Sequence, residues 1–391
     1  MQTKIFTTRF LSLFITNLVI FLVFYSLITT LPLYASGLLG RSDDEAGLLV
    51  TIFLLSAIIM RPFSGKLLDL YGKKRLLILS LIFYLLCTIL YTVFKEFTVL
   101  LALRFFQGIW FSIATTATGS LAADIVPAKK KGTGLGYFMM STNLAIVIGP
   151  FIGLFIIQRT TYDVLFMILS AAVVVGALLA LTLKTSDLPK PAVTEKKFRI
   201  TFGDLFEKKA LPIAAVAAMI AFSYASILSF LSLYSAQKGL LDAASYFYAV
   251  LAVAMIGVRP LTGRIYDTYG AKYVIIPSFI FFAIGLFLLG NAENAALLLT
   301  SAAFIGVGYG TLTTSFQSLC IQATSPQRTG YATATYFTLF DAGIAIGSYV
   351  LGIVAVSVDY SAIYVLSAVL MIVMLVLYLL LFVRQKNKIE A

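Results

Sequence analysis

The sequence predicts an all-α membrane protein with twelve transmembrane helices in two pseudo-symmetric bundles of six. First, 60% of its 391 residues are hydrophobic, only 12% are charged, and the mean hydropathy is +0.99. A soluble domain of this length needs a polar surface, so lipid must surround most of this chain. Second, apolar runs of about 20 residues, long enough to cross a bilayer, recur along the chain. Third, one stretch of sequence occurs twice, half a chain apart.

The apolar runs number twelve and form two sets of six. The first set lies at about residues 10–34, 45–68, 74–94, 97–126, 132–157 and 161–183. The second set lies at about residues 210–237, 244–267, 272–291, 294–322, 330–356 and 360–383. We therefore expect an N-terminal six-helix bundle over 1–183 and a C-terminal six-helix bundle over 210–391.

Residues 184–209 are the one substantial break in this hydrophobic pattern. The segment is charged and contains Pro189 and Pro191. It is interpreted as a cytoplasmic linker, with a short surface helix at Phe202–Glu207. A ligand-binding segment is the alternative interpretation.

The repeated stretch relates the two halves at a constant offset of 198 residues. Arg61–Gly72 returns as Arg259–Gly270, with Arg, Pro, Gly, Asp and Gly at matching positions. The offset persists further along, where Gly132 matches Gly330, Gly149 matches Gly347 and Asn143 matches Asp341. A repeat of half the chain indicates two copies of one large unit, as in transporters built from parallel repeats.

The net charge of +12 is explained by topology better than by nucleic-acid binding. With both termini cytoplasmic, the predicted cytoplasmic side carries 22 Lys and Arg residues and the opposite side carries 4. This asymmetry fixes the expected orientation by the positive-inside rule.

Several classes of chemistry have no support in the sequence. The only cysteines, Cys87 and Cys320, lie inside predicted spans, and the chain has no histidine, so neither a disulfide nor a metal site is expected. The sequence has no phosphate-binding loop for ATP and no cluster of catalytic side chains. We expect no enzyme activity and no cofactor.

The loop after the second predicted span carries the most specific motif. Gly65, Asp69 and Gly72 are followed by Lys73, Lys74 and Arg75. This pattern resembles the signature loop of the major facilitator superfamily. The resemblance covers the whole chain, and the second half carries a weaker copy at Gly263, Asp267 and Gly270.

The motif suggests a conformational latch. Gly65 lets a neighbouring helix come close and present the positive end of its dipole to Asp69. The three basic residues can reach acids such as Asp124. The resemblance implies that this network holds the cytoplasmic faces together in one state and releases them in another; the alternative is a turn with basic anchors.

Two further motifs resemble those of the superfamily's drug:proton antiporter branch. Arg104, with Gln107 three residues later, is similar to the helix-4 motif whose arginine is implicated in proton coupling. Gly149, Pro150 and Gly153 resemble the antiporter signature of helix 5. A buried structural pair for Arg104 and an ordinary packing face for Gly149 and Gly153 are the alternatives.

Asp341 is the expected proton carrier. It is the only acid near a predicted bilayer midplane, where burial favours the protonated form, and its repeat mate Asn143 cannot titrate. A role in binding a cationic substrate, or a buried ion pair with an arginine, are the other possibilities.

Polar and aromatic residues at middle depths are expected to line a substrate cavity. These residues are Asn17, Tyr25, Gln107, Tyr137, Phe138, Asn143, Tyr224, Tyr336, Phe337 and Phe340.

The prediction is a proton-coupled exporter of small amphipathic molecules, working as a monomer by alternating access in a bacterial plasma membrane. Its partners are a small-molecule substrate, protons and lipid, with no nucleic acid. A facilitator-type importer or uniporter of a sugar or amino acid, and an exporter dedicated to a siderophore-like or metal-chelating metabolite, are the alternatives.

Overall fold

The computed structural model describes residues 5–41, 43–184 and 205–380. Most of the predicted linker, including the start of the expected surface helix at Phe202–Glu207, lies outside the described residues. Over the described ranges the chain forms helices and no strand, and twelve of the helices are long and apolar enough to cross a membrane. The predicted fold class is confirmed.

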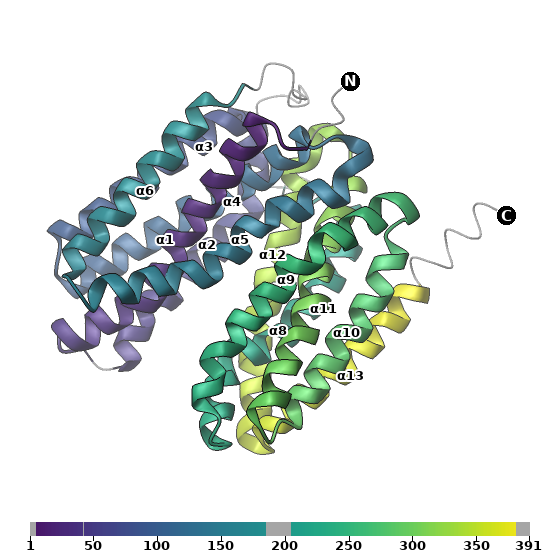
Figure 1. The fold of residues 1–391 in the computed structure, drawn as a ribbon. Coiled ribbons are helices and arrows are strands. Elements are labelled where there is room, and N and C mark those ends of the chain that lie inside the picture. The colour runs from purple at the N-terminus through teal and green to yellow at the C-terminus, as the bar shows by residue number, and fades with distance from the viewer. Residues whose placement is uncertain (1–4, 42, 185–204, 381–391) are drawn as a thin grey trace. The chain divides into compact units, whose positions relative to one another are not determined.

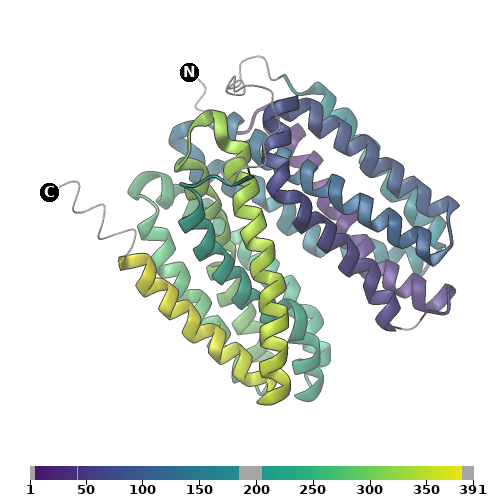
Figure 2. The same cartoon turned by 180° about the vertical axis from the view of Figure 1, so that it is seen from behind.

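The helices of each sequence half run side by side as a bundle (Figures 1 and 2). The first half contains α1 (Thr8–Leu38), α2 (Asp43–Tyr71), α3 (Lys73–Val93), α4 (Phe97–Ile125), α5 (Lys131–Ile157) and α6 (Tyr162–Thr182). The second half contains α8 (Leu211–Gln237), α9 (Leu241–Tyr269), α10 (Lys272–Gly290), α11 (Ala295–Gln322), α12 (Thr329–Ser357) and α13 (Tyr360–Tyr378).

The chain divides into two compact units that exchange short segments. Unit 1 holds most of the first half together with Thr324–Thr335, the first part of α12. Unit 2 holds most of the second half together with Ala128–Tyr137, the first part of α5. The exchanged segments stand at matching places in the repeat, so α5 and α12 each begin in one unit and continue in the other.

The repeat seen in the sequence is also a repeat of packing. In unit 1, α4 packs on α2 and α3, while α6 packs on α1 and α3. In unit 2, α11 packs in the same way on α9 and α10, while α13 packs on α8 and α10. Equivalent apolar faces therefore bury equivalent neighbours in both copies.

Glycines set the tight turns between the second and third helix of each repeat. Gly72 has φ of 86° and Gly270 has φ of 99°, a backbone conformation that residues with a Cβ rarely adopt. A Cβ at either position would have no atom within 4 Å, so the constraint is backbone conformation rather than space. These two glycines end α2 and α9 at the same point of the repeat.

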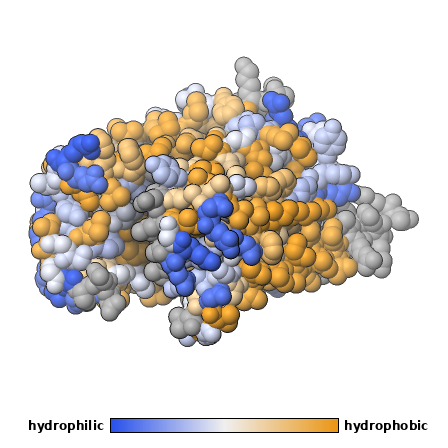
Figure 3. All heavy atoms as spheres, turned by 60° about the horizontal axis from the view of Figure 1, so that its bottom comes forward, coloured by the Kyte–Doolittle hydropathy of each residue, from blue (hydrophilic) through white to orange (hydrophobic). Residues whose placement is uncertain are grey.

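The outer surface of the helices is apolar. Large hydrophobic side chains such as Phe106, Phe151, Val253 and Val369 are more than half exposed. Figure 3 shows, on one face, broad stretches of hydrophobic side chains interrupted by separate groups of hydrophilic ones. Exposed apolar area on this scale is stable against lipid and would aggregate in water.

Gly308 marks a close helix approach that distinguishes the two repeats. A Cβ on Gly308 of α11 would lie 2.4 Å from the backbone nitrogen of Phe282 and 2.7 Å from the carbonyl oxygen of Ser278, both in α10. Its repeat mate is Trp110, whose ring stacks on Phe83 of α3 with centroids 4.4 Å apart. One repeat therefore joins these two helices through backbone contact and the other through stacked rings.

Gly308→Ala should destabilise the protein by about 1–3 kcal/mol, because the added methyl must push α11 away from the backbone of α10. The measurement is thermal unfolding of the purified protein in detergent. Gly257→Ala is the matched control, since a Cβ there meets nothing within 4 Å. Equal melting temperatures for the two variants would contradict the close contact.

Candidate functional site

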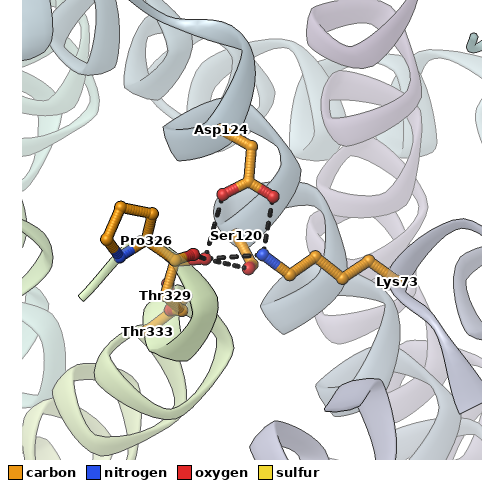
Figure 4. Close-up of polar contacts among 6 residues, drawn as sticks. All are labelled: Lys73, Ser120, Asp124, Pro326, Thr329 and Thr333. Carbon is orange, nitrogen blue, oxygen red and sulfur yellow. Dashed lines mark hydrogen bonds and ion pairs between the residues drawn. The ribbon is translucent and has the colours of Figure 1, made fainter. Parts of the chain in front are cut away.

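Lys73, Asp124 and Thr329 form a compact polar cluster in unit 1 (Figure 4). The Lys73 ammonium donates to Asp124 Oδ2 at 2.6 Å and to the Thr329 hydroxyl, also at 2.6 Å. The Thr329 hydroxyl in turn donates to Asp124 Oδ1 at 3.0 Å and lies 3.1 Å from the hydroxyl of Ser120. The predicted reach of Lys73 to Asp124 is present in the structure.

The cluster is shielded from solvent, which strengthens it. The Asp124 side chain is 1% exposed and that of Lys73 is 13% exposed. A buried carboxylate needs a countercharge and further donors to offset its lost hydration. Lys73 supplies the charge and Thr329, at the first position of α12, supplies a donor, so the start of α12 completes the site around Asp124.

Gly65 allows α12 to begin directly against α2. A Cβ at Gly65 would lie 2.9 Å from Cα of Tyr331 and 3.2 Å from the carbonyl oxygen of Gly330. The expected close approach is therefore present. Asp69, one turn further along α2, accepts a hydrogen bond from the Tyr331 hydroxyl at 3.3 Å, and no main-chain N–H among the described residues donates to it.

The second repeat shows the geometry that was expected at Asp69. Asp267 accepts from the backbone N–H groups of Gly132 at 2.9 Å and Thr133 at 3.0 Å, at the N-terminus of α5. A Cβ at Gly263 would lie 2.8 Å from Cα of Thr133. Thr133 matches Tyr331 of the other repeat. The hydroxyl of Tyr331 donates to Asp69, whereas the matching acid Asp267 is held by the N-terminus of α5.

The charged cluster itself is not repeated. The positions that match Lys73 and Asp124 are Ala271 and Gln322. The Gln322 amide donates to the Ser318 hydroxyl at 3.2 Å. Unit 2 therefore keeps the acid at the helix N-terminus and lacks the lysine–aspartate pair.

The other two basic residues of the motif, Lys74 and Arg75, lie outside the cluster around Asp124. Lys74 donates to the carbonyl oxygens of Leu181 at 2.8 Å and Leu183 at 2.6 Å, which closes the C-terminal end of α6. Arg75 is exposed. Neither joins the cluster around Asp124.

Arg104 is fully buried in α4, at 0% exposure. Its Nε donates to the carbonyl oxygen of Leu49 at 3.0 Å, and Nη1 donates to Gln107 Oε1 at 2.9 Å. The guanidinium carbon also lies 4.2 Å from the centroid of the Phe53 ring. Gln107, three residues further along α4, is thus a partner of Arg104 and is itself held by Tyr91 and Thr88.

Arg104 has no carboxylate partner among the described residues, and its Nη2 has no hydrogen-bond partner there. Carbonyl, amide and aromatic groups offset part of the cost of burying the charge. An uncompensated guanidinium of this kind stabilises an anionic group in its vicinity.

Asn17 and Asn143 occupy different environments. The Asn17 amide donates to the hydroxyls of Ser141 at 2.8 Å and Thr142 at 3.1 Å, and it accepts from Thr118 at 2.8 Å. Asn17 therefore joins α1, α4 and α5. Asn143 is 4% exposed and its amide nitrogen has no hydrogen-bond partner among the described residues.

The helix-5 motif packs against α1. A Cβ at Gly149 would lie 2.8 Å from Cβ of Tyr25, and one at Gly153 would lie 2.9 Å from a methyl carbon of Thr30. The hydroxyl of Ser26 donates to the Gly149 carbonyl oxygen at 2.6 Å. Pro150 lies inside α5 between the two glycines. The packing interpretation accounts for both glycines, and the antiporter role stays a prediction.

Asp341 lies near the middle of α12, twelve residues and about 18 Å from its start. Each of the other acidic residues that the structure describes lies at or near a helix end or in a connection between helices. Tyr336, Phe337 and Phe340 are on the preceding turn, and the Tyr336 and Phe340 rings stack with centroids 5.6 Å apart. Three aromatic side chains thus lie within five residues of Asp341 along α12.

The remaining predicted cavity residues are divided between the units. Tyr25 and Phe138 belong to unit 1, while Tyr137 and Tyr224 belong to unit 2. Phe138 is 2% exposed, and Tyr25 packs edge-on to Phe24. Tyr224 is stacked flat on Tyr309, with centroids 3.8 Å apart. Arg104 and Asp341 likewise belong to different units.

Sequence reasoning did not identify Thr329 and Tyr331. Each lies one position from Gly330, which the 198-residue repeat did identify. Gly330 could have pointed to both residues, because the neighbours of a glycine at a close helix contact are placed to touch the opposite helix. Among the described residues, no group of three or more potential metal ligands is present.

Comparison with known proteins places these features in one family. The family profile described as Major Facilitator Superfamily matches residues 13–348 and 260–391. An uncharacterised MFS-type transporter of Methanocaldococcus jannaschii, MJ1560, is 27% identical over 353 residues, which cover 88% of this chain and 90% of that protein.

The quinolone resistance protein NorA of Staphylococcus aureus is 34% identical over 142 residues, 36% of each chain. Solved structures show the same fold. That of the human organic anion transporter MFSD10 has a TM-score of 0.75 at 14% identity, covering 95% of this chain and 98% of that one. The E. coli fucose:proton symporter FucP has a TM-score of 0.74 at 16% identity, covering 94% and 97%.

A double-mutant cycle on Lys73→Met and Asp124→Asn should give a coupling energy of about 0.5–3 kcal/mol, because the pair is buried and shares Thr329. The measurement is the unfolding free energy of the purified single and double variants.

Lys95 and Asp163 form the matched control, an ion pair whose side chains are 42% and 51% exposed. Solvent screening should limit its coupling to about 1 kcal/mol or less. A coupling at Lys73–Asp124 no larger than at the control pair would rule out a strong cluster.

Proposed function

Because the chain belongs to the Major Facilitator Superfamily, whose members carry small molecules across lipid bilayers, we propose that it exports amphipathic molecules in exchange for protons. The fold is that of a multi-pass membrane transporter. The direction, the proton coupling and the substrate class are the parts that we propose.

The observation that carries the proposal is the position of Asp341. It is an acid near the middle of a membrane helix, a depth at which ionisable side chains are costly to bury and are characteristic of transport sites. Such a group binds a proton from one side of the membrane and releases it when the environment changes. Its repeat mate Asn143 keeps the polarity without the charge, so the proton function is assigned to the second repeat alone.

The substrate class follows from the residues around Asp341. Tyr336, Phe337 and Phe340 supply apolar ring faces, which attract cations as well as flat hydrophobic groups. A carboxylate beside them favours a positive charge on the same ligand. The partial similarity to NorA, named as a quinolone resistance protein, supports an amphipathic drug or metabolite as the substrate.

Arg104 has a complementary role in this proposal. Its charge is buried in unit 1 and no carboxylate pairs with it among the described residues. A fixed positive charge favours the deprotonated state of acids that come near it during the transport cycle. Arg104 would therefore promote proton release from the loaded carrier.

The cluster of Lys73, Asp124 and Thr329 would set the balance between conformational states. Its contacts with the first turn of α12 would favour the conformational state in which they form. Because they are separate hydrogen bonds, they can break one after another when the conformation changes. The proposal further holds that the termini are cytoplasmic, that the protein works as a monomer in a bacterial plasma membrane, and that the proton gradient is the energy source without any cofactor.

The test uses everted membrane vesicles energised to an acid interior, with a pH-sensitive dye as the readout. Cationic dyes, quinolones, sugars and chelating metabolites are added one at a time. A proton antiporter dissipates the gradient when its substrate is added, and vesicles without the protein do not respond. Uptake of a solute into intact cells, with no compound dissipating the gradient, would instead support an importer.

Asp341→Asn should abolish substrate-driven proton movement, a loss of at least about tenfold, because the amide cannot titrate at any physiological pH. Exchange of labelled for unlabelled substrate across the vesicle membrane should persist, since it requires no net proton transfer. Asn143→Asp is the matched variant, because it places an acid at the equivalent position of the first repeat. Normal proton coupling in Asp341→Asn would refute the assignment.

Asp69→Asn should slow turnover by about tenfold while changing substrate affinity much less, because Asp69 contacts Tyr331 at a helix junction and no predicted cavity residue. Initial rates over a range of substrate concentrations separate the two effects. Lost affinity with unchanged maximal rate would be the opposite of what a conformational role predicts.

A further inference from the structure

A small cavity lies in unit 2 beside Arg259. Its volume is about 10 Å³, the room needed by roughly one water-sized sphere. It is lined by Gly132, Gly136, Arg259, Thr262, Gly263, Tyr266, Thr314 and Ser315. Apart from the aliphatic carbons of these residues, the wall therefore offers one guanidinium and several hydroxyl groups.

Arg259 is a buried cation with few partners. It is 3% exposed and donates to the hydroxyl of Thr314. Its Nε has no hydrogen-bond partner, and no carboxylate forms an ion pair with it, in the part of the chain that the structure describes. Removing a guanidinium from water costs several kcal/mol unless a countercharge or hydrogen bonds replace its hydration.

The repeat shows that this arrangement is specific to the second half. Arg61, the mate of Arg259, donates to Thr115 at 3.1 Å, and its guanidinium carbon lies 5.9 Å from the Phe111 ring centroid. The residue that matches Phe111 is Tyr309, whose ring is stacked on Tyr224 instead. In unit 2 the cavity therefore lies beside an arginine that is not covered by an aromatic face of any described residue.

Ser315 provides a second donor at the cavity. Its hydroxyl makes no hydrogen bond to another described residue, although the side chain is only 5% exposed. Its mate in the first repeat is Ala117. By contrast, the hydroxyls of Thr262 and Thr314 already donate to carbonyl oxygens within their own helices.

We propose that this cavity binds a monovalent anion of halide size, held by the guanidinium of Arg259 and the hydroxyl of Ser315. A chloride-sized ion supplies the countercharge that Arg259 lacks and accepts from both unpaired donors. The acid next along α9, Asp267, is already held by the backbone N–H groups of Gly132 and Thr133, which offset its negative charge. Organic anions are too large for the space.

The test is the thermal stability of the purified protein in sodium chloride compared with sodium gluconate at equal ionic strength. A ligand that binds only the folded state raises the melting temperature with its concentration. We expect chloride to raise it saturably, by about 2–5 °C, in the wild type and in the control variant Arg61→Gln.

Arg259→Gln should remove this chloride response. Ser315→Ala should shift the chloride midpoint upward by about tenfold or more, because a hydrogen bond to a charged ligand is lost. Alanine already occupies the equivalent position 117, so this variant keeps the test valid if Arg259→Gln does not fold. Equal stability in the two salts would show that the cavity takes only neutral water, and an unchanged chloride response in Ser315→Ala would equally overturn the site.

Discussion

A charged side chain inside the hydrocarbon layer needs a partner or a polar cavity, because lipid offers it no hydrogen bonds. The described acids obey this constraint at helix ends, where Asp124 is held by Lys73 and Thr329, and Asp267 by the backbone of Gly132 and Thr133. Asp341 lies instead near the middle of α12. The proposed transport mechanism depends on that position.

The internal repeat accounts for the packing that the two halves share, and substitutions between the repeats account for their differences. The two repeats share their helix-packing partners and their positive-φ glycines, Gly72 and Gly270. They differ at several charged positions: Lys73 and Asp124 are matched by Ala271 and Gln322, and Asn143 is matched by Asp341. In the proposed mechanism the two bundles therefore have different roles: unit 1 holds the cluster that controls conformation, and unit 2 holds the proton carrier Asp341.

The fold could be predicted from the sequence because the length of each apolar run and the internal repeat are properties of long segments. An error of a few residues at a helix boundary does not change either property. The close approach at Gly65 and the pairing of Lys73 with Asp124 were also predictable, since the motif and its spacing constrain both. Thr329 and Tyr331 were not, because a partner across 205 to 262 residues leaves no local pattern. Nor could spacing show that Asn17 would be held by Ser141, Thr142 and Thr118.

The central claim is that Asp341 carries the proton that substrate displaces. The most direct measurement is proton release from the purified protein in weakly buffered detergent solution when a substrate is added, followed with a pH indicator. We expect the wild type to release about one proton per bound substrate, at a pH where an acid in the membrane interior is protonated. The Asp341→Asn variant should release none when it binds the same amount of substrate. Equal proton release from both proteins would place the proton elsewhere and contradict the account.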